Sequence, residues 1–441
     1  GRNCAQNAPH FGDKIIALHR KYGPLVRIGP NLVSVSDPAA IPTIYGNKHV
    51  WKKASLVSPS PAPSSQFSAN HYHVQASSSG AATPIYGGQA IPSVITMSEA
   101  SHTSIRRAVR RTFTTSELLE YEAFIDETAE TLVKWSTALP SLISWASSGI
   151  MAAAMKRFDH WNTWAALPNL EYLLIKSPLA RWRSKDDSSL AKVSRQKLAS
   201  RNRAEFPHGT SADLLQKLLA GQSKHADRVT DNEMLGVVMS IISAGADTTA
   251  STFVAIFYFL MRHPPVLAML RAEIDNALRD GTLSDPPRWK QVYQLPYLEA
   301  IIKETMRYWP PFAFGLDRVI PEGGALIAGT MLPAGVEVGA HVEAVHRDYT
   351  VYGDDADIFR PERWTEASEA QRALMDRSFL SFSTGKRVCL GLHIAYRELK
   401  KVVPLLLMKF DVTMRANEQD LLGGAWVTGV KYPPPIFMTF K

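Results

Sequence analysis

The amino-acid sequence predicts a mainly α-helical protein with a small β-rich part. Helix-type spacing of apolar residues recurs from Ser98 to about Pro310 and includes one uninterrupted helix candidate over 230–262. Short alternating segments of the strand type occur over 25–35 and 316–345. An apolar content of 45% and a charged content of 20% are those of a globular chain with a sizeable core.

Composition excludes several classes of protein. The 441 residues hold 49 Lys and Arg against 41 Asp and Glu, an excess of 8 that suits an anionic surface or a membrane but is too diffuse for nucleic acid. Two cysteines, Cys4 and Cys389, allow one bridge at most, which excludes a disulfide scaffold. The chain begins at Gly1 without Met or an apolar signal stretch, so we expect a processed or truncated product.

The N-terminal part is predicted to form a helix, a strand pair and a long loop. Apolar spacing indicates a helix over 11–22, which Gly23-Pro24 ends, and strands over 25–28 and 32–35. Residues 54–98 contain no Lys, Arg, Asp or Glu and are rich in Ser, Pro and Ala, which is typical of a loop. Further helices are expected from Ser98 and from Thr115 to about Leu139.

The longest predicted helix covers 230–262. Thr230 and Glu233 form a capping box, and His263-Pro264-Pro265 ends the helix, which gives a rod of ~48 Å. Asp247 is the only charge between Met234 and Met261. A transmembrane helix is the alternative, but a central Asp costs ~2.5–3.5 kcal/mol on insertion scales. A buried core helix is therefore favoured.

The C-terminal part is predicted to contain short strands, one helix and a tail. Residues 316–345 alternate like short strands joined by turns, such as Gly323-Gly324. A last helix is expected from near Leu390 to Val403-Pro404, and strand with loop from Ala425.

One decapeptide, Phe382 to Gly391, has the form F-x-x-G-x-R-x-C-x-G. Gly385 allows a tight turn that places Cys389 just before a helix, where the helix amides favour a thiolate. Gly391 allows close approach of a flat partner, and Arg387 can pair with an acidic group on it. The alternative is a lone buried cysteine packed as a small hydrophobe, but five matching positions in ten favour the thiolate site.

This decapeptide resembles the haem-binding loop of the cytochrome P-450 superfamily, the haem-thiolate monooxygenases. The resemblance implies the P-450 fold over a single domain, 1–441, and haem b (iron protoporphyrin IX) with Cys389 as the axial ligand of the iron. It also implies haem contacts for Phe382, Gly385, Arg387 and Gly391. The expected reaction inserts one atom of dioxygen into an organic substrate.

Four further segments carry the resemblance. Ala244-Gly245-Ala246-Asp247-Thr248-Thr249 resembles the oxygen-activation motif, which implies haem contact for Ala244 and Gly245 and catalytic roles for Asp247 and Thr248. Glu304 and Arg307 match E-x-x-R. With Arg363 of a P-E-R-W segment they imply a buried structural triad, although the family usually has Phe where Trp364 stands. His102 and Arg106 of an H-x-x-x-R segment, with Arg318, match the residues that bind the haem propionates.

The resemblance also implies partners. Electrons are expected from NADPH through a reductase, with cytochrome b5 as a further donor, and docking is expected to use Lys386, Arg397, Lys400 and Lys401. The expected reaction is hydroxylation or O-demethylation. A small apolar substrate is expected between the helix predicted over 230–262 and the residues that follow the E-x-x-R segment. Its expected pocket residues, for which core packing is the alternative, are Ile242, Ser243, Ala246, Phe312 and Phe314.

The segment Tyr22 to Asn31 is similar to fungal microsomal members of the pisatin demethylase type, which act in secondary metabolism at the cytosolic face of the endoplasmic reticulum membrane. We expect a monomer that binds no nucleic acid. Residues 140–178 lack an apolar segment ending in Phe-Gly that the family carries. Two alternatives stay open: a haem binder that is impaired or incompletely folded, and a reductase-independent isomerase or dehydratase, against which Asp247-Thr248 argues.

Overall fold

Helices predominate in the structure, a computed structural model, as the sequence predicts. The structure describes residues 11–47, 50–54, 99–138, 189–201, 212–225, 229–414 and 436–441. The loop expected over 54–98, beyond Ala54, and the irregular region expected over 140–178 lie outside these ranges. The chain divides into two units: Gly1–Cys4, Lys52–Tyr121 and Ser148–Asp247 form the first, and Ala5–Trp51, Glu122–Ser147 and Thr248–Lys441 form the second.

The first unit is helical in its described part. Helix α12 begins with a capping box, in which the Asp213 carboxylate accepts the amide of Gln216 and the Gln216 side chain accepts the amide of Asp213, both at 2.8 Å. Helices α5 and α12 approach closely, since a Cβ on Gly221 would lie 2.6 Å from the Ala108 carbonyl oxygen. The elements are α5 (Glu99–Val109), η2 (Arg110–Phe113), α6 (Thr115–Leu118), η3 (Leu119–Tyr121), α11 (Ser189–Ala199), α12 (Leu214–Ser223) and the first half of α13 (Asp231–Arg262).

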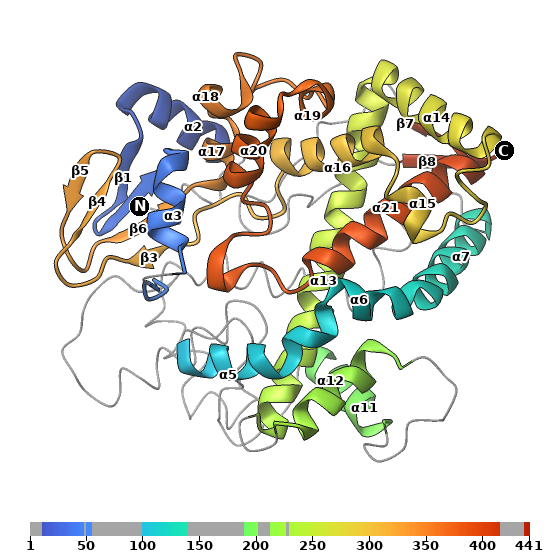
Figure 1. Ribbon diagram of the computed structural model, residues 1–441, viewed down its shortest axis with the longest axis horizontal. Coiled ribbons are helices and arrows are strands. Elements are labelled where there is room, and N and C mark those ends of the chain that lie inside the picture. Colours follow the sequence, from blue (N-terminus) through green and yellow to red (C-terminus); the bar gives the residue numbers. More distant parts are fainter. Residues whose placement is uncertain are drawn as a thin grey trace. The chain divides into compact units, whose positions relative to one another are not determined.

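The second unit holds a sheet of four strands in the order β1-β2-β6-β3. Strand β1 (Leu25–Gly29) runs antiparallel to β2 (Leu32–Val35), β2 runs parallel to β6 (Glu337–Ala340), and β3 (Arg318–Val319) runs antiparallel to β6. Figure 1 shows α2 (Phe11–Tyr22) and α3 (Ile41–Tyr45) beside this sheet. Two hairpins complete the β-structure: β4 (Ala325–Ile327) with β5 (Thr330–Leu332), and β7 (Phe410–Met414) with β8 (Ile436–Phe440).

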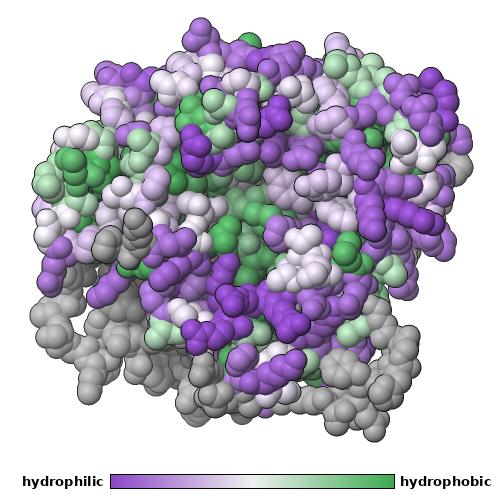
Figure 2. Space-filling model, in the orientation of Figure 1, coloured by the Kyte–Doolittle hydropathy of each residue, from purple (hydrophilic) through white to green (hydrophobic). Residues whose placement is uncertain are grey.

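The helices of the second unit surround its main apolar core. This core joins buried side chains of α7, the second half of α13, α14, α16 and α21, together with Phe410, Val412 and Ile436 of the β7–β8 pair. Figure 2 shows that polar residues predominate on one face of the protein, with apolar ones in separate groups. The helical elements are η1 (Pro38–Ala40), α7 (Glu122–Ala138), α14 (Pro264–Arg279), α15 (Trp289–Val292), α16 (Pro296–Tyr308), α17 (Val342–His346), α18 (Tyr349–Tyr352), α19 (Glu362–Glu366), α20 (Glu369–Ser378), η6 (Gly385–Arg387) and α21 (Leu392–Lys409).

Helix α13 has the predicted ends. The Glu233 carboxylate accepts the Thr230 amide at 2.8 Å, and the Thr230 hydroxyl accepts the Glu233 amide at 3.2 Å. Among the described residues it is the one helix long and apolar enough to cross a membrane, and half of its most apolar stretch is buried in the protein. Its residues 255–260 belong to the main core, as expected of a core helix.

Two predicted helices are wrong in extent. The helix expected from Thr115 to about Leu139 is interrupted by the 3₁₀ turn η3, after which α7 begins at Glu122. The last helix passes through Pro404 and ends at Lys409. The buried residues Leu405, Leu406 and Leu407 follow the proline, so their packing in the core outweighs the loss of one helical hydrogen bond.

Candidate functional site

The segment that bears Cys389, residues 380–391, forms a loop before α21, called the Cys loop below. Two tight turns shape it: the Ser383 amide donates to the Leu380 carbonyl at 2.8 Å, and the Val388 amide donates to the Gly385 carbonyl at 3.1 Å. The Cys389 amide donates to the Phe382 carbonyl at 2.9 Å and closes the loop. Cys389 is exposed and its thiol is not part of a disulfide.

Gly385 fixes the Cys loop against helix α3. Its φ of +69° lies in the left-handed region, and a Cβ at this position would stand 1.9 Å from the carbonyl oxygen of Tyr45. Tyr45 is itself anchored, because its buried hydroxyl accepts the Ala340 amide at 3.0 Å. Tyr45 therefore connects the Cys loop to strand β6 of the sheet. No local motif in the sequence marks this tyrosine.

The surroundings of Cys389 fit a haem iron with one protein ligand. The sulfur stands at the start of α21, where free helix amides and the helix dipole favour a thiolate. A Cβ on Gly391 would lie 3.9 Å from the Sγ atom, in ordinary van der Waals contact, so this glycine lies directly beside the sulfur. Phe382 packs on Tyr396 of α21 with ring centroids 5.4 Å apart.

The structure brings Glu304, Arg307 and Arg363 together in a buried network. Two parallel hydrogen bonds, of 2.8 and 2.7 Å, join the Arg307 guanidinium to the Glu304 carboxylate, and the Arg363 Nε atom donates to Glu304 at 3.1 Å. Burial by itself would raise the pKa of Glu304, but the two cations and their hydrogen bonds outweigh it and hold the pKa below the usual range. Glu304 therefore stays ionised inside the protein.

Trp364 adds a bond to this network. Its indole Nε1 atom donates to the Glu304 Oε2 atom at 3.0 Å, and the Arg360 amide donates to Oε1 at 2.9 Å. A phenylalanine, which the family pattern has at this place, carries no donor. The departure noted in the sequence thus supplies a further hydrogen bond to a buried carboxylate.

The cations expected at the haem propionates occupy different settings. Arg318 is 4% exposed, lies over the Tyr45 ring at 5.0 Å from its centroid, and donates to the Leu316 carbonyl at 2.7 Å. Arg387 ends the 3₁₀ turn η6 and is half-buried. His102 and Arg106 lie four residues apart on one face of α5, where His102 is buried and Arg106 half-buried.

The middle of α13 has an open face and a covered face. Ala244, Gly245 and Ala246 are exposed although the helix is buried over 234–240, and a Cβ on Gly245 would meet no atom within 4 Å. Ser243 and Asp247, four residues apart, share the covered face with exposed fractions of 6% and 7%. Thr248 is half-buried and lies one turn after Ala244. The small residues thus leave space beside the helix that a planar group could fill.

The expected pocket residues are unequally accessible. Ile242 and Phe312 are half-buried and Ala246 is exposed. Phe314 is 4% exposed, and its ring lies 5.8 Å from that of Phe312. Ser243 and Phe314 therefore offer a ligand little surface, in line with the core packing that was the alternative for them.

The prediction that Arg397, Lys400 and Lys401 form a docking surface is wrong. These three side chains of α21 are 2–3% exposed. Lys400 pairs with Glu299 of α16 at 2.8 Å, Lys401 pairs with Glu122 of α7 at 2.7 Å, and the Arg397 guanidinium lies 4.4 Å from the Trp289 ring centroid. Of the four predicted docking cations, only Lys386 is exposed.

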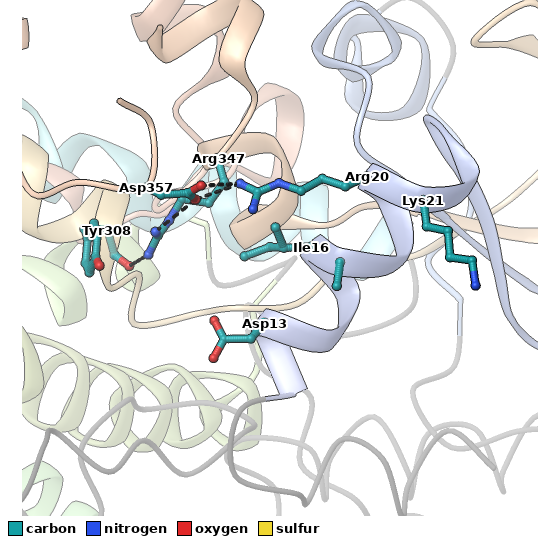
Figure 3. A pocket seen from close by; sticks show the side chains of 8 residues that line it. Asp13, Ile16, Arg20, Lys21, Tyr308, Arg347 and Asp357 are labelled. Atoms are coloured by element: carbon teal, nitrogen blue, oxygen red, sulfur yellow. Dashed lines mark hydrogen bonds and ion pairs between the residues drawn. The ribbon is translucent and has the colours of Figure 1, made fainter. Parts of the chain in front are cut away.

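A pocket of about 620 Å³ lies beside α2 within the second unit. Figure 3 shows Arg20 and Arg347 both reaching toward Asp357, with Arg347 near Tyr308. The Arg20 and Asp357 charges neutralise each other at 2.6 Å, and the Arg347 guanidinium lies 3.8 Å from the Tyr308 ring centroid. Its lining holds no residue of the Cys loop; the lining residues are Asp13, Ile16, Ala17, Arg20, Lys21, Tyr308, Arg347 and Asp357.

Comparison with known proteins shows which family the chain resembles in sequence. The family model for cytochrome P-450 matches residues 149–440. A cytochrome P-450 monooxygenase of Aspergillus terreus is 32% identical over 438 residues, which cover 90% of this chain and 84% of the relative. The monooxygenase cicH of Emericella nidulans is 31% identical over 440 residues, covering 91% and 83%.

A solved structure shares the fold. A zebrafish cytochrome P-450, in a structure with abiraterone, aligns with a TM-score of 0.68 at 21% identity, over 98% of this chain and 99% of that one. The mainly helical architecture with small sheets is thereby confirmed. The family model and the sequence relatives show that this chain belongs to the cytochrome P-450 family of monooxygenases.

Proposed function

We propose that Cys389 is the axial ligand of a haem b iron and that the chain hydroxylates or O-demethylates a small apolar substrate. The observation that carries this proposal is the exposed, unbridged thiol at the start of α21, in a loop closed by its own backbone. Arg318, Arg387, His102 and Arg106 are proposed to neutralise the two propionates. Haem, when bound, supplies the oxygen chemistry, and the protein supplies the ligand, the protons and the orientation.

Asp247 and Thr248 are proposed to handle protons. Because Asp247 is 7% exposed, its carboxyl can hold a proton apart from bulk solvent, and the neighbouring Thr248 Oγ1 atom can pass it on to the reacting oxygen. Ala244 and Gly245 are exposed and carry no large side chain, so this part of the helix is proposed to face haem and oxygen. Ile242, Ala246 and Phe312 have accessible surface to orient an apolar substrate.

The source of electrons is proposed to be NADPH through a reductase, with cytochrome b5 as a second donor. Lys386, which is exposed and precedes Cys389 by three residues, is the one of the four predicted docking cations that such a partner could reach. By family resemblance we also propose one catalytic domain, a pisatin demethylase-like role in fungal secondary metabolism, and the cytosolic face of the endoplasmic reticulum membrane.

The dithionite-reduced, carbon-monoxide difference spectrum of the purified chain tests the ligand assignment. The wild type should show the Soret band of a thiolate-ligated haem, and Cys389→Ser should lose it. A Lys386→Ala variant, altered at an exposed residue of the same loop, serves as the control and should keep the band, because dithionite supplies the electrons without a docked reductase. An unchanged band in Cys389→Ser would refute the assignment.

A further inference from the structure

A buried histidine joins the end of helix α16 to the beginning of the Cys loop. His346 is the last residue of α17 and is 0% exposed. Its Nδ1 atom lies 3.1 Å from the carbonyl oxygen of Arg307, and its Nε2 atom lies 2.9 Å from the amide nitrogen of Leu380. One imidazole thus connects the helix that carries Glu304 with the first residue of the Cys loop.

The two partners determine the tautomer of His346. A carbonyl oxygen only accepts and a backbone amide only donates, so Nδ1 carries the proton and Nε2 accepts. Burial, together with the positive charge of Arg307, lowers the pKa of His346 to about 3. The ring therefore remains neutral at physiological pH and keeps both bonds. Phe379 stacks on it at 5.3 Å between centroids and 10° between planes, which limits rotation of the ring.

The neighbouring residue ties α17 to α16 a second time. Arg347 donates to the carbonyl oxygen of Tyr308 at 3.0 Å, one residue after the carbonyl that His346 binds. Asp357 faces the same guanidinium at 3.6 Å in the wall of the pocket in Figure 3. His346 is therefore fixed to α16 by its own Nδ1 bond and by the bond of Arg347. The position of the Leu380 amide then depends on the Nε2 atom that accepts it.

The position of Leu380 is passed on to the sulfur. The Leu380 carbonyl accepts the Ser383 amide at 2.8 Å, and the Phe382 carbonyl accepts the Cys389 amide at 2.9 Å. Ser381 donates to the Met306 carbonyl at 2.9 Å and adds a second tether to α16. Only short, hydrogen-bonded turns separate the histidine from the thiol.

We propose that His346 is a positioning residue for the Cys389 sulfur, which it holds in place by accepting the Leu380 amide at Nε2. This inference rests on the proposed function, in which Cys389 ligates the haem iron. Without the acceptor, the buried Leu380 amide is left unsatisfied, and the Cys loop shifts to find another partner. The iron–sulfur bond then breaks more readily.

Two substitutions separate the two bonds of the ring. The amide of asparagine reaches the Nδ1 position and that of glutamine reaches the Nε2 position, so His346→Asn loses the acceptor for Leu380 and His346→Gln keeps it. His19→Asn is the matched control. His19 is also buried, with Nδ1 3.0 Å from the Gly23 carbonyl and Nε2 2.7 Å from the Ser34 hydroxyl, both outside the Cys loop.

The experiment follows the carbon-monoxide spectrum of each haem-loaded full chain, at a temperature well below its unfolding midpoint. We expect His346→Asn to convert to the thiolate-lost form about tenfold faster than wild type, the factor for one hydrogen bond of ordinary strength. His346→Gln and His19→Asn should convert at the wild-type rate, and the iron reduction potential should shift in His346→Asn alone. A merely structural role would lower the unfolding midpoint without changing the conversion rate.

Equal conversion rates in His346→Asn and His346→Gln, or in His346→Asn and His19→Asn, would overturn the inference. If His346→Asn yields no folded holoprotein, hydrogen exchange at the Leu380 amide decides instead. Protection in wild type and in His346→Gln supports the link, and exchange at the rate of an open loop overturns it. A wild type without any thiolate band would refute the proposed function itself, which is a distinguishable result.

Discussion

Replacing Trp364 by phenylalanine tests whether the indole stabilises the buried Glu304 carboxylate. Glu304 accepts bonds from Arg307 and Trp364 on Oε2, and from Arg307, Arg363 and the Arg360 amide on Oε1. Trp364→Phe removes the bond from the indole and part of the ring. A hydrogen bond to a charged group contributes about 1.5–3 kcal/mol, and the smaller ring adds to the loss.

Trp309 provides the matched control. It caps the end of α16, and its Nε1 atom is buried without a hydrogen-bond partner among the described residues. Trp309→Phe therefore removes a comparable part of a ring but no such bond. Unfolding in urea, followed by circular dichroism and Soret absorbance, should show a loss for Trp364→Phe that exceeds that for Trp309→Phe by about 1.5–2 kcal/mol.

Measuring the free energies of unfolding of Trp364→Phe and Trp309→Phe at several pH values tests whether the ionised Glu304 carboxylate causes the difference. The pKa of Glu304 is lowered in the folded state, so its contribution to stability is present above the unfolded value of about 4.3 and is lost as pH falls through the folded pKa. The difference between the two variants should accordingly shrink in acid. Losses equal within about 0.5 kcal/mol at pH 7 would refute the role of the indole.

Further predictions concern the loop, the charges and the protons. Gly385→Ala, which meets the Tyr45 carbonyl, should greatly reduce the haem-thiolate band, whereas Gly335→Ala, also at positive φ but with nothing within 4 Å, should keep it. Lys386→Met should raise the KM for the reductase without lowering stability. Lys401→Met should lower the free energy of unfolding by about 1–3 kcal/mol, because Glu122 and Asp126 lose this partner. A raised KM in Lys401→Met, with an unchanged KM in Lys386→Met, would restore α21 as the docking surface. The folded pKa of His346, about 3, lies below the unfolded value of about 6.5, so the unfolded state binds the proton first and the free energy of unfolding should fall by ~1.4 kcal/mol for each unit that pH is lowered between these two values. His346→Gln should remove this part of the acid dependence in urea unfolding. Thr248→Ala should keep haem and divert NADPH oxidation to hydrogen peroxide, and unaltered coupling to product would remove Thr248 from the proton path.

Local signals in the sequence predicted the elements that depend on local chemistry. The Thr230–Glu233 box marked the beginning of α13, and Gly23-Pro24 marked the end of α2. The strand pair over 25–35 likewise follows from alternation around a Gly-Pro-Asn turn. These features need no information from distant parts of the chain.

Features that depend on distant partners were not predictable. From the sequence alone, a lysine in a helix is expected at the protein surface. Lys400 is buried instead because it pairs with Glu299, which lies 101 residues away in the chain. The same holds for Tyr45, whose carbonyl requires glycine at position 385, and for His346, whose partners lie on two other segments. The motif residues of the Cys loop could be found from spacing, but what holds that loop could not.

The three buried cations of α21 determine how this helix is aligned. Arg397, Lys400 and Lys401 each meet a different helix: α15, α16 and α7 respectively. A slip of one residue would move α21 by about 1.5 Å and rotate it by about 100°, which would carry the ammonium groups away from their carboxylates and toward apolar neighbours. A buried charge that loses its partner is strongly destabilising, so such a slip is disfavoured. These three contacts therefore hold α21 at one position along its axis, and they also fix the place of the Cys389 sulfur before its first turn.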